Sequence, residues 1–325
     1  DLPKTSFGIK IEDDKFTPEY RISSDHSAIV KEIKELAKNA DQIYLATDED
    51  REAAEKYANR KPIADFDGKG VLADGTRVPL YANVGDGKSA EKAASLNAEG
   101  VGLLRTEFGF LGHDAEPSIE AQAATYKSVF DAFPGKHIVV RTLDAGADKP
   151  LPFLNVNPEE NPALGVRGFR TDWTVPGVLT RQLEAIKQAS EDSDADIWVM
   201  APMISTTSEA RNFAKMLKEV GLPVHGVMVE TPAAAVNAEA ILGEVDFVSI
   251  GTNDLTQYTM AADRLLGDLA HLNNPWQPAV LKMIKLTVKG AKRASVNAGE
   301  KKYVSVCGEA AADPALAVVL VGLGV

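Results

Sequence analysis

The sequence predicts a parallel α/β barrel, (β/α)8, preceded by a shorter α/β segment of different character. From about residue 65 onward, short apolar runs typical of buried strands alternate with longer segments typical of helices. Most of these apolar runs end in arginine, acidic or other polar residues, as the strands of a barrel do at its functional mouth. A length of 325 residues is enough for one such barrel and an added segment.

Eight apolar runs are too short for helices and are therefore predicted to be strands. They are residues 78–84, 101–104, 137–140, 163–166, 197–202, 226–229, 247–250 and 303–306. Gly165 and Gly168 weaken the fourth of them, because glycine in a strand adds no side chain to the packing.

Helices are expected between these strands, in segments with helical spacing or with good helix formers. They are residues 89–97, 118–130, 178–190, 208–220, 233–242, a long helix within 276–297, and 314–323. The chain stops soon after the last of them, so we expect the end of the barrel to be truncated. The barrel domain is expected to span residues 63–325.

Residues 1–62 form a segment unlike the rest, with a helix expected at 27–38 and a strand at 42–46. The stretch from DLPKT through ADQIYLATDEDRE resembles part of the Toprim domain of bacterial type I topoisomerases. That resemblance implies that Asp48 and Asp50 could bind Mg²⁺, whereas the residues alone also fit a solvated acidic loop. A fusion or hybrid origin of this segment is one interpretation.

His26 lies in the sequence SSDHSAIV, which is similar to the phosphohistidine motif of phosphoenolpyruvate-using enzymes. The Gly-rich approach and the following Ile-Pro strand of that motif are absent here. A role for His26 therefore stays open, and the favoured interpretation is that it is not the phosphorylated residue.

The composition excludes several classes of function. The formal net charge of -12 argues against general nucleic-acid binding, although a local arginine cluster could still bind an anion. The single cysteine, Cys307, excludes an internal disulfide and favours a reducing compartment. No apolar run is long enough to span a bilayer, and the first residues are not a signal peptide, so a cytoplasmic protein is expected.

Polar residues that follow the predicted strands should meet at one mouth of the barrel, because the carboxyl ends of parallel strands lie together. They are Arg105, Glu107, Arg141, Asp144, Arg167, Glu230, Asn253, Asp254 and Cys307. With Arg264, four arginines are available, and their guanidinium forks match phosphate and carboxylate groups. A small substrate that carries both groups fits this set. The alternative for any one arginine is an ion pair with a local acid such as Glu107 or Asp144.

Glu230 and Asp254 follow two neighbouring predicted strands, and their carboxylates could share one Mg²⁺. Cys307 has two interpretations when it is taken alone. It is either a small buried hydrophobic residue or an acid–base thiol at the mouth.

Six motifs carry a specific resemblance to a known family. They are GVGLLRTEFGFLG, IVVRTLDAGADKPLPF, NPALGVRGFR, GVMVETPAAA, SIGTNDLTQYTMAADR and VCGEAAADP. In this order, over about residues 65–325, they resemble the phosphoenolpyruvate-binding domain of enzyme I of the bacterial sugar phosphotransferase system. Pyruvate phosphate dikinase and phosphoenolpyruvate synthase share this barrel and are the alternative, together with a non-catalytic barrel that senses phosphoenolpyruvate.

The resemblance implies roles for individual residues at the mouth. It implies substrate binding by Arg105, Arg141, Arg167, Asn253, Asp254 and Arg264, with catalytic roles for Arg105 and Arg141. It implies that Glu230 and Asp254 bind Mg²⁺. It also implies that Cys307 delivers a proton to C3 of the pyruvate enolate.

The resemblance further implies Mg²⁺-dependent transfer of the phosphoryl group from phosphoenolpyruvate to a histidine on a separate domain. The next acceptor is the carrier protein HPr, and pyruvate is released. We expect this chain to lack the phosphohistidine domain. A homodimer that forms through the barrel is also implied.

Overall fold

The computed structural model describes residues 9–12, 15–18, 68–72, 74–146, 151–154 and 158–325. The chain divides into two compact units, Asp1–Asp65 and Phe66–Val325. In the first unit, β1 (Ile9–Glu12) and β2 (Lys15–Pro18) form an antiparallel pair. Asp48, Asp50, His26, the helix predicted at 27–38 and the strand predicted at 42–46 all lie outside the described residues.

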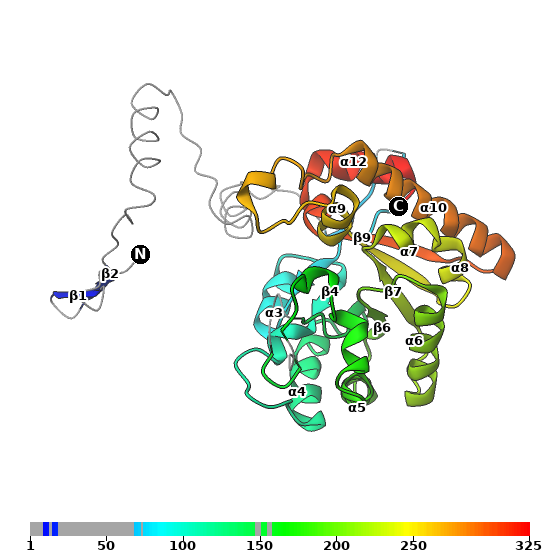
Figure 1. The fold of residues 1–325 in the computed structure, drawn as a ribbon. Helices are drawn as coiled ribbons and strands as arrows, with labels where there is room; N and C mark the ends of the chain where they lie inside the picture. The colour runs from blue at the N-terminus through cyan, green and yellow to red at the C-terminus, as the bar shows by residue number, and fades with distance from the viewer. Residues whose placement is uncertain (1–8, 13–14, 19–67, 73, 147–150, 155–157) are drawn as a thin grey trace, which may run out of the picture. The chain divides into compact units, whose positions relative to one another are not determined.

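The second unit is built on one sheet of seven parallel strands, each paired with the next along the chain (Figure 1). The strands are β3 (Ala82–Val84), β4 (Gly100–Arg105), β5 (His137–Arg141), β6 (Asp196–Ala201), β7 (His225–Val229), β8 (Phe247–Gly251) and β9 (Tyr303–Cys307). The sequential parallel order with helical crossovers is that of a (β/α) barrel. β3 and β9 are the two ends of the sheet and are not hydrogen-bonded to each other.

The prediction of a closed eight-stranded barrel is therefore wrong. Residues 163–166 form no strand, and β5 pairs directly with β6 with no gap for a further strand. The chain there forms two 3₁₀ helices, η3 (Pro162–Leu164) and η4 (Gly168–Trp173). Pro162 has no N–H to give to a sheet, and Gly168 takes a φ of +59°, which a strand does not allow.

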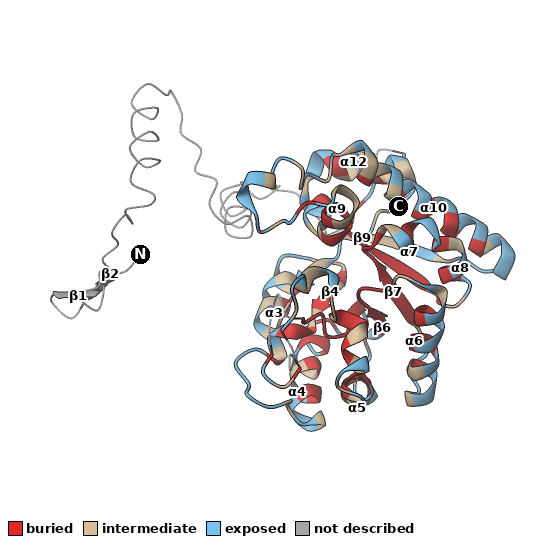
Figure 2. Ribbon diagram, viewed as in Figure 1, coloured by how far each residue is buried: buried red, intermediate tan, exposed pale blue. Residues whose placement is uncertain are grey.

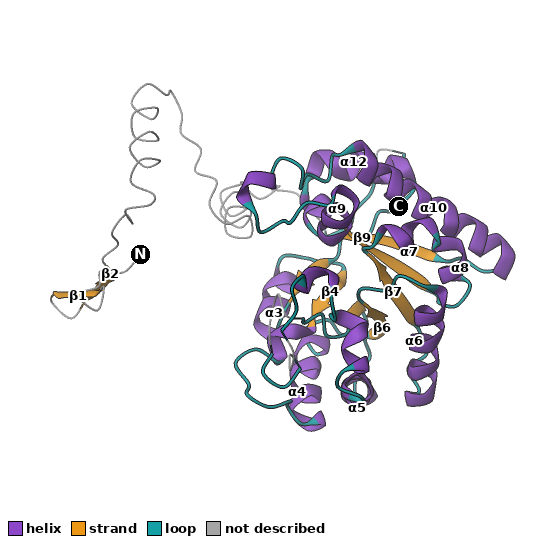
Figure 3. Ribbon diagram, viewed as in Figure 1, coloured by secondary structure: helices purple, strands orange, loops and turns teal. Residues whose placement is uncertain are grey.

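Helices surround the strands, as Figure 3 shows. They are α3 (Gly87–Ser95), α4 (Ile119–Phe130), α5 (Val178–Glu191), α6 (Thr207–Val220), α7 (Pro232–Val236), α8 (Ala238–Leu242), α9 (Thr252–Met260), α10 (Pro278–Ala298), α11 (Glu309–Ala312) and α12 (Pro314–Leu323). Two further 3₁₀ helices are η2 (Thr106–Gly109) and η5 (Gly267–Leu269). The helix predicted at 233–242 is two short helices that meet at Asn237.

Local sequence signals explain where these helices begin and end. Thr206 and Glu209 form a capping box at the start of α6, where each side chain accepts a hydrogen bond from the other's backbone N–H. Gly221 ends α6 in the left-handed conformation, with φ of 84°. Ser118 caps α4 through the N–H of Ala121.

The strands bury both faces, because their side chains alternate between two cores. One core lies between the sheet and the helices and includes Leu104, Val140 and Val248. The other lies on the inner face of the curved sheet and consists of Leu103, Val139, Met200, Met228 and Phe247. Figure 2 shows the buried residues on the strands and on the sides of the helices that face them. Because both faces of the strands are buried, the strand ends that bear the polar residues are held in position.

A search of the described helices finds none with the length and the apolar character needed to cross a bilayer.

Candidate active site at the carboxyl ends of the strands

Arg105 and Arg141 are the last residues of the neighbouring strands β4 and β5, and they are paired in the sheet register. Arg141 is buried and forms ion pairs with Glu107 and with Asp144, whose Oδ2 lies 3.0 Å from its Nη1. Arg105 stacks on the ring of Phe108, with 4.8 Å between its Cζ and the ring centroid. Among the described residues Arg105 has no ion-pair partner, and its buried Nε has no hydrogen-bond partner.

Arg167 connects acids that lie far apart in the sequence. It is only 1% exposed, and its guanidinium lies 3.0 Å from Asp144 and 3.2 Å from Asp254. Burial alone would lower the pKa of Arg167, but these two carboxylates raise it above its usual value. The segment that carries Arg167 fits tightly against β6, because a Cβ at Gly168 would lie 3.1 Å from Met203 and Pro202. The guanidinium therefore stays charged and lies between Asp144 and Asp254.

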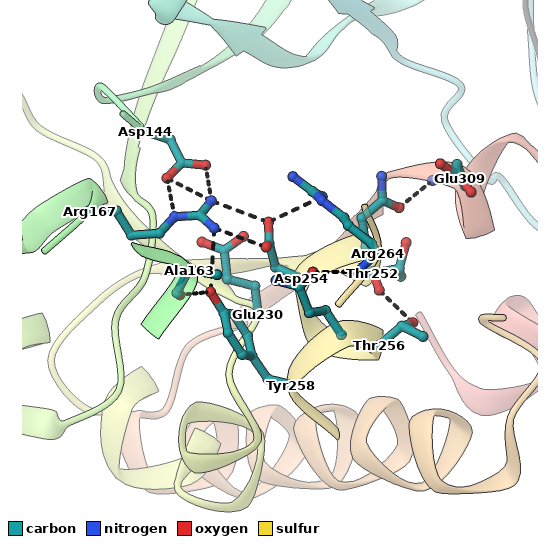
Figure 4. A network of polar contacts seen from close by, with 12 residues as sticks. Asp144, Ala163, Arg167, Glu230, Thr252, Asp254, Thr256, Tyr258, Arg264 and Glu309 are labelled. Carbon is teal, nitrogen blue, oxygen red and sulfur yellow. Dashed lines mark hydrogen bonds and ion pairs between the residues drawn. The ribbon is translucent and has the colours of Figure 1, made fainter. Parts of the chain in front are cut away.

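Asp254 is held in the first turn of α9, which begins immediately after β8. Besides Arg167, it faces Arg264, whose Nη1 lies 3.7 Å from its Oδ2 (Figure 4). Tyr258, one turn further along α9, accepts a hydrogen bond from Arg167 at 3.4 Å and donates one to the carbonyl of Ala163. Tyr258 thus ties α9 to the irregular segment before Arg167. A carboxylate in the first turn of a helix is also stabilised by the helix dipole.

Glu230 follows β7 and is 1% exposed. Its Oε1 accepts a hydrogen bond of 2.7 Å from the backbone N–H of Met203, which takes an unusual φ of +60°. A Cβ at Gly251 would lie 2.8 Å from its Oε2, so only glycine leaves room for this carboxylate at the end of β8. Burial, together with the charges of Asp144 and Asp254, raises the pKa of Glu230 to about 8. Figure 4 shows its carboxylate beside the carboxylate of Asp254 and the guanidinium of Arg167.

Cys307 ends β9 opposite Gly251 of β8. Its thiol donates to the carbonyl of Ile250 at 3.5 Å, and burial raises the pKa of Cys307 to about 11. The next residue, Gly308, has φ of +87°, and a Cβ there would lie 2.6 Å from the hydroxyl of Thr252. That hydroxyl donates to the carbonyl of Cys307 at 2.9 Å. These contacts hold a neutral, protonated thiol at the end of the last strand.

Asn253 is next to Asp254 in α9, and its Oδ1 accepts a hydrogen bond of 3.0 Å from the N–H of Glu309. Its side chain therefore faces the segment that follows Cys307.

The structure brings the predicted residues to the same edge of the sheet. Arg141, Arg167 and Arg264 are joined through Asp144 and Asp254 into one network of ion pairs. The charges of Glu107, Asp144 and Glu230 all raise the pKa of Arg141 against the effect of burial, so Glu230 belongs to the same cluster. Arg105 lies beside Arg141.

The alternative of an ion pair with a local acid is correct for Arg141, which pairs with Glu107 and Asp144. It also holds for Arg167, which pairs with Asp144 and, in addition, with Asp254, an acid distant in sequence. Tyr258 was not among the site residues predicted from the sequence. Its position one helical turn after Asp254 is the signal that could have found it, had α9 been predicted.

Glu230 and Asp254 are two carboxylates. The described residues contain no cluster of three or more His, Cys, Asp or Glu side chains arranged for a metal ion.

Comparison with known proteins gives the family. Residues 64–325 match the family described as "PEP-utilising enzyme, PEP-binding domain", where PEP is phosphoenolpyruvate. The phosphoenolpyruvate-protein phosphotransferase of Streptomyces coelicolor is 50% identical over 277 residues, which are 85% of this chain and 49% of that protein. The enzyme of the same name from Haloferax volcanii is 40% identical over 300 residues, 88% of this chain and 51% of that protein. That from Staphylococcus carnosus is 40% identical over 270 residues, 79% of this chain and 46% of that protein.

The chain spans about half the length of these curated relatives. The family match covers the whole seven-stranded sheet and each residue of the network described above. The chain therefore belongs to the family of phosphoenolpyruvate-utilising enzymes and carries their phosphoenolpyruvate-binding domain.

Proposed function

We propose that the second unit is the phosphoenolpyruvate-binding catalytic domain of a phosphoenolpyruvate-protein phosphotransferase (enzyme I). It binds phosphoenolpyruvate at the carboxyl ends of β4 to β9. The observation that carries this proposal is the pair of adjacent arginines Arg105 and Arg141. In each arginine, the buried Nε has no hydrogen-bond partner among the described residues. The buried Oε2 of the neighbouring Glu107 also has none. Unsatisfied buried donors at a strand end are costly unless a ligand meets them.

The four arginines divide into two kinds. Arg105 has no carboxylate partner within the described ranges, so it is ready to meet an anion. Arg141, Arg167 and Arg264 already face Glu107, Asp144 and Asp254. An incoming phosphate must therefore compete with these carboxylates for the same guanidinium groups.

A divalent cation held by acids of this cluster would lessen that competition. Glu230 and Asp254 offer two neighbouring carboxylates, and the pKa of Glu230 is raised by burial and, to a smaller extent, by the charges of Asp144 and Asp254. Mg²⁺ typically takes one or two protein carboxylates and completes its shell with water and substrate phosphate, so this donor set fits. We propose that Glu230 and Asp254 hold Mg²⁺, which neutralises charge on the transferring phosphoryl group. Once Asp254 is engaged, Arg167 and Arg264 are released to contact the ligand.

Each remaining residue has a role that its surroundings support. Arg105 and Arg141 orient the anionic groups of the substrate and stabilise the charge that develops during transfer. Asn253 contributes its amide as a further contact to the substrate. The thiol of Cys307 keeps its proton at neutral pH because burial raises its pKa to about 11. It can therefore deliver that proton to C3 of the pyruvate enolate.

In the complete system, the phosphoryl group passes to a histidine on a separate domain and then to HPr, and pyruvate is released. The similarity to phosphotransferases from several organisms supports these partners. A homodimer formed through the barrel is part of the same proposal. Sedimentation velocity with and without phosphoenolpyruvate and Mg²⁺ would test the dimer.

Calorimetric titration with phosphoenolpyruvate tests the binding directly. The unmodified chain should bind in the presence of Mg²⁺ and much more weakly in EDTA. Arg105→Met should weaken binding by about a hundredfold, since two charge-assisted hydrogen bonds of about 1.5 kcal/mol each are lost. It should leave stability nearly unchanged, because no buried acid loses its partner.

Arg181→Met is the matched control. Arg181 lies on α5 and pairs with Glu116 at 2.6 Å, outside the site. This variant should bind phosphoenolpyruvate as the unmodified chain does. Binding that is independent of both Mg²⁺ and Arg105 would refute the proposed function.

A further inference from the structure

Four buried polar side chains lie behind the arginine cluster and take no part in its ion pairs. Thr106, Gln122, Tyr126 and Gln182 are each at most 3% exposed, and we name them the Gln182 network. Thr106 begins η2, Gln122 and Tyr126 lie on α4, and Gln182 lies on α5. Burying so many polar groups in the layer between helices and sheet is unfavourable unless each is hydrogen-bonded.

The hydrogen bonds of this network run in a consistent direction away from Gln182. Its Nε2 donates to the hydroxyl of Thr106 and to that of Tyr126, both at 3.0 Å. Tyr126 donates in turn to Oε1 of Gln122 at 3.3 Å, and Gln122 donates to the carbonyl of Pro117 at 2.9 Å. Both amide hydrogens of Gln182 are used, so its orientation is determined.

One branch of the network ends on the backbone of the site. Thr106 donates to the carbonyl of Arg141 at 2.9 Å, and Oε1 of Gln182 accepts from the N–H of Leu143 at 2.8 Å. The pair of Arg105 and Arg141 is the last in the register between β4 and β5. Beyond this pair, the hydrogen bonds between β4 and β5 end. The side chains of Thr106 and Gln182 then bind the backbone of the segment that leads to Asp144.

The position of that chain decides the position of two guanidinium groups. Asp144 lies 3.0 Å from Arg141 and 3.0 Å from Arg167 and so sets where both can lie. On its other side, the chain is tied to β6 through the N–H of Thr142, which donates to the carbonyl of Met200 at 2.9 Å. The segment 141–144 is thus fixed between β6 and α5.

We propose that Thr106 and Gln182 are positioning residues that hold the segment 141–144 in the geometry needed to bind the anionic ligand. They act through Arg141 and Asp144 and do not touch the ligand. The inference rests on the proposed function, in that the ligand is taken to be phosphoenolpyruvate. The other branch, through Tyr126 and Gln122, ends on Pro117 and supports the fold away from the site.

The two branches provide a matched experiment on the full chain. Thr106→Val and Gln182→Met each remove hydrogen bonds to the site backbone with little change in size. Thr106→Ser keeps the hydroxyl. Tyr126→Phe removes the hydroxyl that accepts from Gln182 in the other branch, while the bonds of Gln182 to Thr106 and Leu143 can still form. Each variant is measured for phosphoenolpyruvate affinity by calorimetry with Mg²⁺, for its urea unfolding midpoint, and for hydrogen exchange of peptides that cover residues 141–146.

Thr106→Val and Gln182→Met should weaken phosphoenolpyruvate binding by about tenfold and speed exchange in residues 141–146. Thr106→Ser and Tyr126→Phe should stay within about twofold of the unmodified chain in affinity. Should Gln182→Met fail to fold, the pair of Thr106→Val and Thr106→Ser decides the question.

Unchanged affinity and exchange in Thr106→Val would overturn the inference. So would an equal loss of affinity in Tyr126→Phe, because the effect would then follow general destabilisation. Failure of the unmodified chain to bind phosphoenolpyruvate would refute the proposed function instead. In that case the exchange of residues 141–146 alone decides whether the Gln182 network positions the segment.

Discussion

The two ends of the same seven strands are built in opposite ways. At the amino end, aromatic rings of different strands contact one another. Trp198 lies 4.5 Å from His137, 4.9 Å from Phe247 and 5.4 Å from Tyr303, measured between ring centroids. At the carboxyl end, Arg141, Arg167 and Arg264 pair with three acids, and Arg141, Arg167 and Glu230 are buried there.

This difference indicates how stability and function are divided. Aromatic rings in contact stabilise the fold by burying apolar area and by edge-to-face contacts, with little dependence on a ligand. Buried charges gain little net stability, because their desolvation offsets their attraction. The carboxyl end is therefore an arrangement kept for binding, while the amino end holds the strands together. The predictions below separate the two.

Arg141→Met should have the largest effect, because it damages both properties at once. It leaves Glu107 and Asp144 without their shared cation, which should lower the free energy of unfolding by about 3–5 kcal/mol. Phosphoenolpyruvate binding should also be lost in calorimetry. Adding Glu107→Gln should recover part of the stability, measured by urea unfolding, but none of the binding. Recovery of binding in the double variant would contradict the division.

Cys307→Ala should cost chemistry without costing stability. The thiol makes one weak hydrogen bond to Ile250, so its removal should change the unfolding midpoint little. Loss of the proton donor should slow solvent deuterium exchange into C3 of pyruvate by about 10²- to 10⁴-fold. Proton NMR of pyruvate with Mg²⁺ measures this rate. A normal exchange rate would remove Cys307 from the proposed mechanism.

Trp198→Ala is the counterpart at the amino end. Loss of the ring contacts should lower the free energy of unfolding by about 2–4 kcal/mol. Affinity for phosphoenolpyruvate should stay unchanged at temperatures where the variant is folded. Circular dichroism and calorimetry on the same sample provide the two readings. If this variant lost its affinity while folded, the two ends would not be independent.

Glu230→Gln should have the smallest effect, and it should depend on pH. As the pH rises from about 5 to 8, Glu230 keeps its proton in the folded chain while it ionises in the unfolded chain. The unfolded state then binds fewer protons, so stability falls with rising pH. Glutamine does not titrate, so the variant should avoid this fall, and its stability should change less than that of the unmodified chain between about pH 5 and 8.

The comparison is made in EDTA by urea unfolding at several pH values. Adding Mg²⁺ should raise the free energy of unfolding of the unmodified chain. It should not raise that of Glu230→Gln, because this variant lacks the carboxylate. Parallel pH profiles of the two proteins would show that Glu230 is not the group responsible.

The sequence was most informative where burial alone decides the structure. The runs at 101–104, 137–140 and 247–250 are apolar on both faces, and each forms a buried strand close to its predicted bounds. Helix starts with clear caps, such as Ser118 and Thr206, were also predicted to within a residue. In both cases the deciding interactions are local.

The rest depended on contacts that a single sequence does not reveal. Residues 163–166 look apolar enough for a strand, but β6 occupies the place beside β5. Asp254 was expected directly after a strand, and it lies there in the first turn of α9, a helix that was not predicted. Arg105 and Arg141 could be chosen from their positions at the ends of strands, whereas Arg167 was chosen from a predicted strand that does not form. Their pairing could not be predicted in this way, because the partners of Arg167 come from β5's end and from α9.

The most direct test is a crystal structure of the chain with phosphoenolpyruvate and Mn²⁺ in place of Mg²⁺, using the anomalous signal of manganese to place the ion. The expected result is an anomalous peak between the carboxylates of Glu230 and Asp254. The phosphate should contact Arg105 and Arg141, and Arg167 should have left Asp254. A peak elsewhere, or a ligand bound away from the carboxyl ends of the strands, would contradict the account.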